Sequence, residues 1–404
     1  MRPIPHAAGI YLAVLQFVFA LCWTAYAIYL PRLAASVGLS AGAVIVILML
    51  DQAIFTITDF SMGVAADKVS RVVGRLGYWA AAITLVSCAA FVGLPFVADA
   101  HLSATALLAL TVIWAVTSSA LRAPPLMLLG KYAARPAIPY LASLAMLGLG
   151  VAGAVSPYLA MVLTNQDPRL PFIISSVALV LVALALTKVE RTLAKQAPAN
   201  NAPPKTIDRA VPAPILTFGL AIVIFAFGFQ LHFFFNSAPL FKKFTTDIGT
   251  LMPVFWAGFS VGMFPASLIT KRWGGLPVMG AAGLLGAIAI VLMQSATALP
   301  LTIAAQLVVR ASWGCILMSA FAAAAALGAT GHEGKTTGLL FSALALATFA
   351  RMAASASGAL NDPTLAQLLR WAPIACWAIA GALLVALSAA YVRRSRVVRL
   401  NSAT

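Results

Sequence analysis

Apolar segments long enough to cross a lipid bilayer recur along the whole sequence. A transmembrane helix needs about 20 mainly apolar residues, because the hydrocarbon core is about 30 Å thick. Twelve segments meet this requirement. They are residues 9–30, 41–64, 77–98, 103–130, 137–163, 172–188, 214–236, 250–270, 274–295, 299–327, 338–360 and 371–391. The sequence therefore predicts an all-α membrane protein with twelve transmembrane helices.

The composition agrees with a membrane protein. Hydrophobic residues make up 62 % of the chain and charged residues only 9 %, whereas about a quarter of the residues of soluble proteins are charged. The formal net charge is +16, but lysines and arginines stand mostly at the ends of apolar segments, so we expect no nucleic-acid partner. The four cysteines are scattered singly, which favours neither a metal site nor a disulfide framework. We expect no cofactor.

One long polar interruption divides the chain into two halves. Residues 188–213 are rich in proline, alanine, asparagine and charge, a composition that cannot bury a core and is typical of a flexible linker. The predicted organisation is a six-helix bundle at 1–187, a linker at 188–213, a second six-helix bundle at 214–392 and a basic tail at 393–404.

The positions of lysine and arginine predict the orientation in the membrane. Cytoplasmic loops carry an excess of these residues. Most of the 26 basic residues fall on the side that holds both termini and the linker. We therefore expect that side to be cytoplasmic, in a multi-pass protein of a bacterial inner membrane that works as a monomer.

A short motif follows the second apolar segment. Residues 63–71 read Gly-Val-Ala-Ala-Asp-Lys-Val-Ser-Arg. They resemble the G-x-x-A/G-D-R/K-x-G-R motif of the major facilitator superfamily, with Ser70 in place of the second glycine and Val72 in place of the final basic residue. With the twelve segments and the central linker, the resemblance covers essentially the whole chain.

The resemblance implies a secondary transporter and not an enzyme. In this family two six-helix bundles rock about a site near the middle of the membrane. No P-loop, His-Glu-x-x-His or Gly-x-Ser-x-Gly motif occurs in the sequence, which disfavours ATP hydrolysis and intramembrane proteolysis. The gating motif is expected to pair across helices and hold the cytoplasmic side shut, although a plain anchoring role of its basic residues is also open. Its residues are Gly63, Asp67, Lys68, Arg71 and Arg75.

Charged residues inside the predicted helices need a reason, because each costs at least about 2.5 kcal/mol at mid-bilayer. Asp51 and Asp59 lie in the second segment on neighbouring helix faces. Both are candidates for proton coupling. Asp51 could equally be the fixed ion-pair partner of an arginine, and for Asp59 a structural ion pair is favoured over proton coupling. Arg122 precedes Pro124, where we expect a kink, and lies at a depth similar to that of Asp59. We therefore expect Arg122 and Asp59 to pair.

Arg310 is the first candidate for a substrate ligand. Gln306, Arg310 and Trp313 follow one another at i, i+4 and i+7 on one helix face. A guanidinium group can clamp a carboxylate or a phosphate through two parallel hydrogen bonds. The spans of the second half hold no carboxylate that would neutralise Arg310 or Arg351, so an anionic substrate is expected to do so.

The resemblance implies that the first, fourth, seventh and tenth helices line the central cavity. Polar residues on these helices complete the predicted substrate-binding set, although packing equally explains Tyr26, and hydrogen-bonded structure explains His232 better than a proton relay does. The additional members are Gln16, Tyr26, Arg122, His232 and Asn236.

The sequence thus predicts a secondary active transporter that moves a small organic anion with proton coupling. Its expected partners are an anionic small molecule, protons and the lipid bilayer. One alternative is a proton-driven efflux antiporter for drugs or metabolites, which is preferred if amphipathic cations bind and require Asp51. Another, from a different class, is a transporter-like sensor or lipid-handling membrane protein that moves no soluble substrate.

Overall fold

Helices make up nearly all of the regular structure in this protein. The structure is a computed structural model that describes residues 5–100, 103–197, 213–246, 249–328 and 331–401. Within these ranges, twelve helical spans are long and apolar enough to cross a membrane, and no strand occurs. The predicted all-α membrane fold with twelve spans is therefore confirmed.

The first half of the chain supplies six of these spans. They are α1 (His6–Ser36), α2 (Ala41–Val69), α3 (Arg75–Asp99), α4 (Ala104–Ser118) with η1 (Ser119–Leu121) and α5 (Ala123–Tyr132), η2 (Arg135–Ala137) with α6 (Ile138–Leu163), and α7 (Arg169–Gln196). Helix α7 continues beyond residue 188 into the segment assigned above to the linker. The rest of that linker, 198–212, lies outside the described residues.

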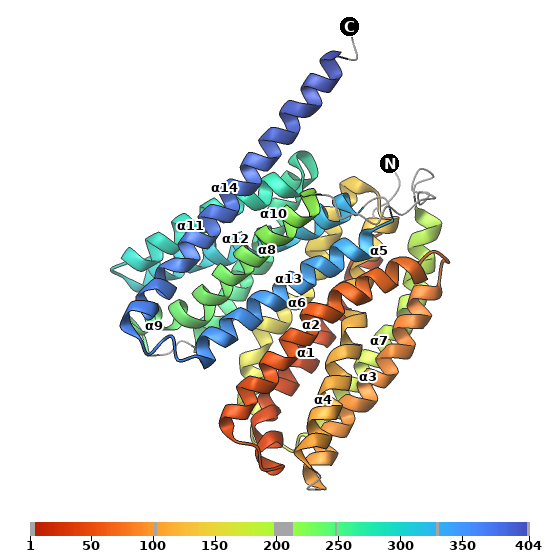
Figure 1. Ribbon diagram of the computed structural model, residues 1–404, viewed down its shortest axis with the longest axis vertical. Coiled ribbons are helices and arrows are strands. Elements are labelled where there is room, and N and C mark those ends of the chain that lie inside the picture. The colour runs from red at the N-terminus through yellow and green to blue at the C-terminus, as the bar shows by residue number, and fades with distance from the viewer. Residues whose placement is uncertain (1–4, 101–102, 198–212, 247–248, 329–330, 402–404) are drawn as a thin grey trace.

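The second half supplies the other six spans. They are α8 (Ala213–Leu231) with the π-helical turn η3 (His232–Asn236) and α9 (Ser237–Lys242), η4 (Gly249–Leu251) with α10 (Met252–Trp273), α11 (Gly275–Ser295), α12 (Leu299–Leu327), α13 (Glu333–Ala356) and α14 (Pro363–Asn401). Helix α14 runs through most of the predicted basic tail at 393–404, of which residues 402–404 lie outside the described part. Helix α1 begins and α14 ends at the same end of the molecule, which we call the termini end (Figure 1).

The fourth span breaks where the sequence predicts a kink. Helix α4 ends at Ser118, a short 3₁₀ turn follows, and α5 begins after Arg122. Pro124 and Pro125 lack backbone N–H groups, so the regular hydrogen-bond ladder cannot run through them. The break sets Arg122 at the junction of the two helices.

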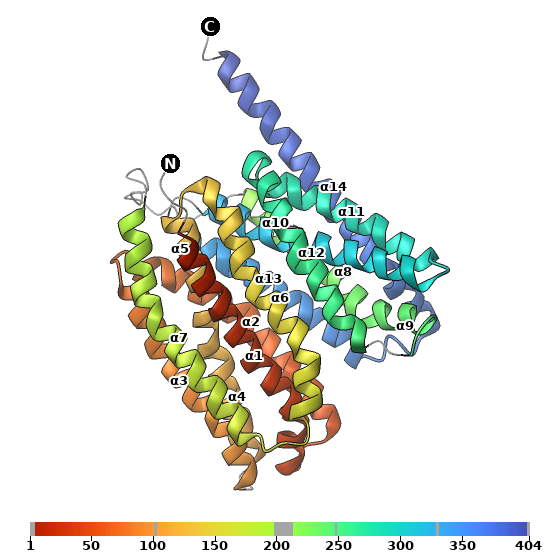
Figure 2. The same ribbon diagram turned by 180° about the vertical axis from the view of Figure 1, so that it is seen from behind.

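Two helix pairs make the most extensive contacts between the bundles: α2 packs on α13, and α6 packs on α10 (Figures 1 and 2). Glycines permit very close approach at both contacts. A Cβ atom added to Gly63 would lie 2.2 Å from the carbonyl oxygen of Gly334, and one added to Gly153 would lie 2.3 Å from the ring of Trp256. Small residues at such contacts let helix backbones meet.

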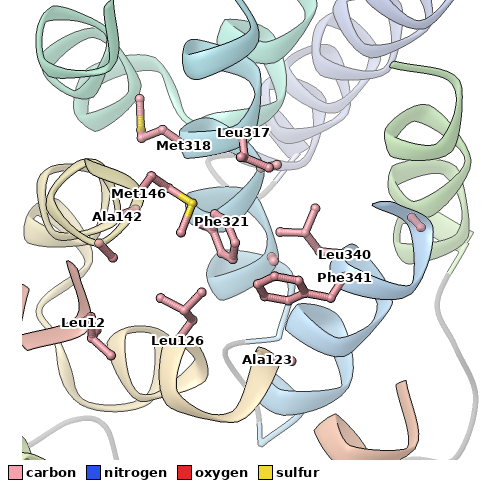
Figure 3. Close-up of a cluster of buried hydrophobic side chains, with 14 of the residues drawn as sticks. Leu12, Ala123, Leu126, Ala142, Met146, Leu317, Met318, Phe321, Leu340 and Phe341 are labelled. Carbon is pink, nitrogen blue, oxygen red and sulfur yellow. The ribbon is translucent and has the colours of Figure 1, made fainter. Parts of the chain in front are cut away.

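Apolar side chains from both bundles fill the space between them (Figure 3). Leu126 on α5 and Met146 on α6 face Phe321 on α12 and Phe341 on α13 in this cluster (Figure 3). Phe321 stands less than two turns before the end of α12 at the termini end. Together with the α2–α13 contact, this cluster closes the molecule at that end.

Substituting Gly63 by valine should open this closed end. The added side chain meets backbone atoms of Gly334, which cannot yield without separating α2 from α13. A cysteine placed at Ala325, which is buried at the α5–α12 contact, reports the opening through its rate of thiol labelling, with the four native cysteines replaced by alanine. Overpacking costs about 1–3 kcal/mol, so the labelling rate should rise about fivefold or more.

Gly42→Ala on the same helix is the matched control, because an added Cβ there meets only Ser40, at 3.8 Å. Its labelling rate should equal that of the parent protein. Equal labelling in the Gly63→Val and Gly42→Ala variants would show that the α2–α13 contact does not hold the termini end closed.

Candidate functional site

A fully buried arginine stands among aromatic rings in the second bundle. Arg310 on α12 is 0 % exposed. Its guanidinium carbon lies 4.2 Å from the ring centroid of Phe233, 4.7 Å from that of Trp256 and 5.3 Å from that of Phe229. We call these three rings the arginine cage. Within the described residues, no carboxylate lies within 4.0 Å of this arginine and none of its three side-chain nitrogens has a hydrogen-bond partner.

The chemistry of this cage favours an anion. Aromatic faces attract a cation by about 0.5–2 kcal/mol, but the penalty for desolvating an ion is several kcal/mol. A carboxylate or phosphate group of a ligand would supply the missing hydrogen-bond acceptors and the opposite charge. Arg310 can therefore bind an anion that enters between the rings.

A hydrogen-bonded chain runs beside the cage. His232 Nε2 and Gln306 Oε1 lie 2.8 Å apart, and Gln306 Nε2 donates to the hydroxyl of Ser237 at 3.1 Å. His232 begins the π-helical turn η3, and such turns insert an extra residue into a helix and re-aim its side chains, frequently at functional sites. Because Phe233 directly follows His232, the π-helical turn places this hydrogen-bonded chain beside the arginine cage.

Arg351 reaches the same aromatic group from α13. Its guanidinium carbon lies 4.1 Å from the centroid of Phe234, and the rings of Phe233 and Phe234 are 4.8 Å apart. Like Arg310, it has no carboxylate within 4.0 Å in the described part of the chain. Two of the three arginines predicted as substrate ligands, Arg310 and Arg351, therefore contact adjoining phenylalanines.

A buried carboxylate occupies the first bundle. Asp51 on α2 is 0 % exposed and accepts a hydrogen bond of 2.8 Å from the hydroxyl of Tyr26 on α1. Trp114 on α4 packs on the ring of Tyr26 at 4.5 Å, and Trp23 packs on it at 5.4 Å. Among the described residues no arginine pairs with Asp51, and its second carboxylate oxygen has no hydrogen-bond partner.

The second carboxylate of α2 is paired. Asp59 Oδ2 lies 3.4 Å from Arg122 Nη2, which confirms the predicted ion pair. The guanidinium group of Arg122 also lies over the ring of Phe55 at 4.2 Å. Thr58 and Ser119 share a hydrogen bond of 2.7 Å next to the pair. The charge of Arg122 is thus engaged inside the first bundle, in contrast to that of Arg310.

The gating motif makes a contact between the bundles. The carboxylate of Asp67 accepts hydrogen bonds from the backbone N–H groups of Gly334 at 2.6 Å and Lys335 at 2.8 Å, at the first turn of α13. A helix N-terminus has unpaired N–H groups and partial positive charge. Asp67 therefore caps a helix of the opposite bundle.

The motif was predicted to pair across helices, and Asp67 does so, with backbone N–H groups as its partners. Lys68, Arg71 and Arg75 are exposed, and in the described part of the structure none of them lies within 4.0 Å of a carboxylate. Asp67 faces α13, whereas the next residue, Lys68, is exposed, and Arg71 and Arg75 follow after α2 has ended at Val69.

A family model described as Major Facilitator Superfamily matches residues 12–351. The chain belongs to the major facilitator superfamily. It is therefore a multi-pass integral membrane protein with a transporter fold. The comparison with curated proteins finds no match.

Solved structures of other transporters share the fold. The human organic anion transporter MFSD10 (TETRAN) is 14 % identical, with 96 % of this chain and 99 % of that chain covered at a TM-score of 0.67. A bacterial homologue of the iron transporter ferroportin, in an outward-facing state, is 13 % identical, with 95 % and 99 % covered at a TM-score of 0.73. The Escherichia coli fucose:proton symporter is 12 % identical, with 93 % and 97 % covered at a TM-score of 0.61.

Within this facilitator fold, the remaining predicted site residues have different surroundings. Trp313 stacks on Phe229 at 4.3 Å and so supports the arginine cage. Asn236 donates to the carbonyl oxygen of Arg370 at 2.9 Å, which ties the seventh span to α14. Gln16 is buried on α1, more than two turns before Tyr26.

The aromatic residues of the cage were not predicted. Residues 225–235 hold six phenylalanines in a row of eleven positions, reading Phe-Ala-Phe-Gly-Phe-Gln-Leu-His-Phe-Phe-Phe. This density of phenylalanines around the polar His232 is the sequence feature from which an aromatic site could have been predicted. Trp256 comes from a different helix, α10, and only the packing of α10 on α12 brings it to Arg310.

Proposed function

We propose that the protein is a secondary active transporter that moves a small organic anion by alternating access, coupled to protons and working as a monomer. The observation that carries the proposal is Arg310, a fully buried cation with aromatic neighbours and no counter-charge among the described residues. Such a group gains most from a ligand that brings a negative charge. Arg351 contacts Phe234, which packs against Phe233 of the arginine cage, so a second positive charge lies near Arg310.

The aromatic walls favour an anion with an apolar or flat body. Phe229, Phe233 and Trp256 surround the guanidinium group, and rings of this kind bind apolar and planar groups by stacking. A carboxylate attached to such a body would meet Arg310, and the body would meet the rings.

Closure at the termini end supports alternating access. The Asp67 cap and the Gly63–Gly334 backbone contact join the bundles there, and each can break without cutting a covalent bond when the bundles rock. From the basic residues of the loops, we place this end in the cytoplasm of a bacterial cell, with the protein in the inner membrane.

A thermal-shift screen of the purified protein tests the proposed substrate class. Small aromatic carboxylates are compared with lipophilic cations of similar size. A ligand at 100 times its dissociation constant stabilises a protein by about 2.7 kcal/mol, which raises the melting temperature measurably. Stabilisation by carboxylates supports the proposal, and stabilisation by cations alone would contradict it.

The proposed proton carrier is Asp51, whose carboxylate is buried but unpaired by arginine. In proteoliposomes, Asp51→Asn should abolish accumulation of the anion driven by a pH gradient, because asparagine carries no exchangeable acid proton across. Exchange of labelled for unlabelled anion should persist. Ser61→Ala, at an exposed position of the same helix, is the control. Gradient-driven accumulation that survives in Asp51→Asn would remove Asp51 from the coupling step.

The efflux antiporter is the second candidate function, and the surroundings of Asp51 favour it. Tyr26, Trp23 and Trp114 form an aromatic group beside a buried carboxylate, and aromatic faces with a nearby negative charge attract organic cations. The same thermal-shift screen separates the two functions. Cation stabilisation that disappears in Asp51→Asn would identify the antiporter.

A further inference from the structure

A groove between α3 and α7 near the termini end lies outside the proposed transport site. The two helices pack side by side in both views of the molecule (Figures 1 and 2). The groove has a volume of about 460 Å³ and is lined by Tyr78 and Ala81 from α3 and by Leu184, Lys188, Arg191 and Lys195 from α7. We propose that this groove binds the headgroup of an anionic phospholipid.

Three cations line one side of the groove. Lys188, Arg191 and Lys195 follow one another at i, i+3 and i+7 on α7, so they project from one helix face. All three are exposed, and within the described residues no carboxylate lies within 4.0 Å of any of them. Their charge is thus free to meet a phosphate group.

Arg191 is held in place toward the groove. Its Nη2 donates to the hydroxyl of Tyr78 at 3.4 Å, and its guanidinium carbon lies 5.7 Å from the centroid of that ring. Gly74, at φ 88°, lies directly against the side chain, since a Cβ there would be 3.0 Å from Arg191 Nε. A side chain fixed in this way loses less entropy when it binds a ligand.

The neighbouring acid faces away from the groove. Glu190 is 0 % exposed and accepts a hydrogen bond from the backbone N–H of Gly77 at 3.0 Å, on the interior side of α7. A zwitterionic headgroup would therefore bring an ammonium group with no carboxylate to receive it. A headgroup with net negative charge matches the groove better.

Apolar side chains continue the groove toward the middle of the membrane. Leu184 lines it, and Leu181 on α7 and Leu85 on α3 follow on the same faces, 54 %, 63 % and 52 % exposed respectively. The seven residues from Tyr78 to Leu85 add about 10 Å of helix. A phosphate among the cations would thus have its acyl chains along these leucines, which is why we assign a lipid and not a soluble phosphate.

Basic pockets between transmembrane helices on the cytoplasmic side are a known way to recognise anionic headgroups, and each basic residue near the surface contributes about 1 kcal/mol. Because the three cations share one helix face, their contributions act in the same groove. Tyr78, with a polar hydroxyl and an apolar ring, lies at the boundary between the two regions.

The test is native mass spectrometry of the full-length protein in detergent, titrated with dioleoyl phosphatidylglycerol, dioleoyl phosphatidylcholine or inorganic phosphate. The wild type should bind phosphatidylglycerol at least about tenfold more tightly than phosphatidylcholine. The triple variant Lys188→Gln, Arg191→Gln, Lys195→Gln should weaken phosphatidylglycerol binding about 100-fold, given about 1 kcal/mol per cation. Lys195→Gln alone, at the exposed end of the groove, should weaken it about fivefold.

The matched control removes three other exposed cations from the same end: Arg135→Gln, Lys271→Gln, Arg272→Gln. Its affinity for phosphatidylglycerol should stay within about twofold of wild type, since none of these residues lines the groove. An equal loss in both triple variants would mean diffuse attraction and overturn the proposal. Displacement of the lipid by inorganic phosphate would assign a soluble anion site, and unchanged binding in the groove variants would remove the site altogether.

Discussion

Replacing Arg310 with glutamine should abolish stabilisation by the proposed anionic substrate and weaken its binding by at least about 30-fold. Truncating one partner of a buried, hydrogen-bonded charge pair costs about 2–5 kcal/mol, and every 1.4 kcal/mol is tenfold in affinity. Without ligand, Arg310→Gln should be at least as stable as the wild type, because the cage then holds no unpaired charge. Thermal shift and uptake into proteoliposomes measure the two effects.

Two companion variants sharpen this experiment. Arg310→Lys retains the charge but not the planar fork, so it should bind the anion with intermediate affinity. Arg370→Gln removes an exposed arginine of α14 whose side chain lies outside the cage, and should behave as wild type. Anion binding that is equal in Arg310→Gln and Arg370→Gln would exclude the cage as the anion site and leave Arg351 as the next candidate.

Neutralising Asp59 should destabilise the first bundle by about 3 kcal/mol, because it leaves Arg122, whose side chain is only 15 % exposed, without its counter-charge. The double variant Asp59→Asn, Arg122→Gln should recover most of that loss, since no unpaired charge is left. Unfolding in mixed detergent, followed by circular dichroism, gives the free energies of the single and double variants. A double variant that loses the sum of both single losses would show that the two side chains are energetically independent.

The fold follows from features that the sequence displays locally. Bilayer-length apolar segments, the prolines after Arg122 and the polar stretch from residue 188 each depend on neighbours in the chain. Their consequences, twelve spans and a broken fourth span, appear in the structure. The end of α7 was set too early because Lys188, Arg191 and Lys195 read as linker, although charged residues continue a helix readily once it leaves the membrane.

The candidate site could be predicted mainly where a charged or polar residue interrupts an apolar segment. Asp59 and Arg122 stand out as intramembrane charges at similar depth, and they pair. The partners of Asp67 are backbone N–H groups at the start of α13, more than 260 residues away. A pattern of side chains in the sequence cannot predict a backbone donor. Likewise, Trp256 cannot be distinguished in the sequence from other apolar residues, because only the packing of α10 against α12 brings it to Arg310.

The tight contact of α2 and α13 has a mechanical consequence. Gly63 and Gly334 touch through their backbones, so these helices can pivot at this point but cannot slide closer. Asp51 lies twelve residues before Gly63 on α2, and Arg351 lies seventeen residues after Gly334 on α13, which corresponds to lever arms of about 18 Å and 25 Å. A tilt of about 10° at this contact moves each ionisable group by about 3–4 Å, enough to make or break an ion contact with the proposed substrate.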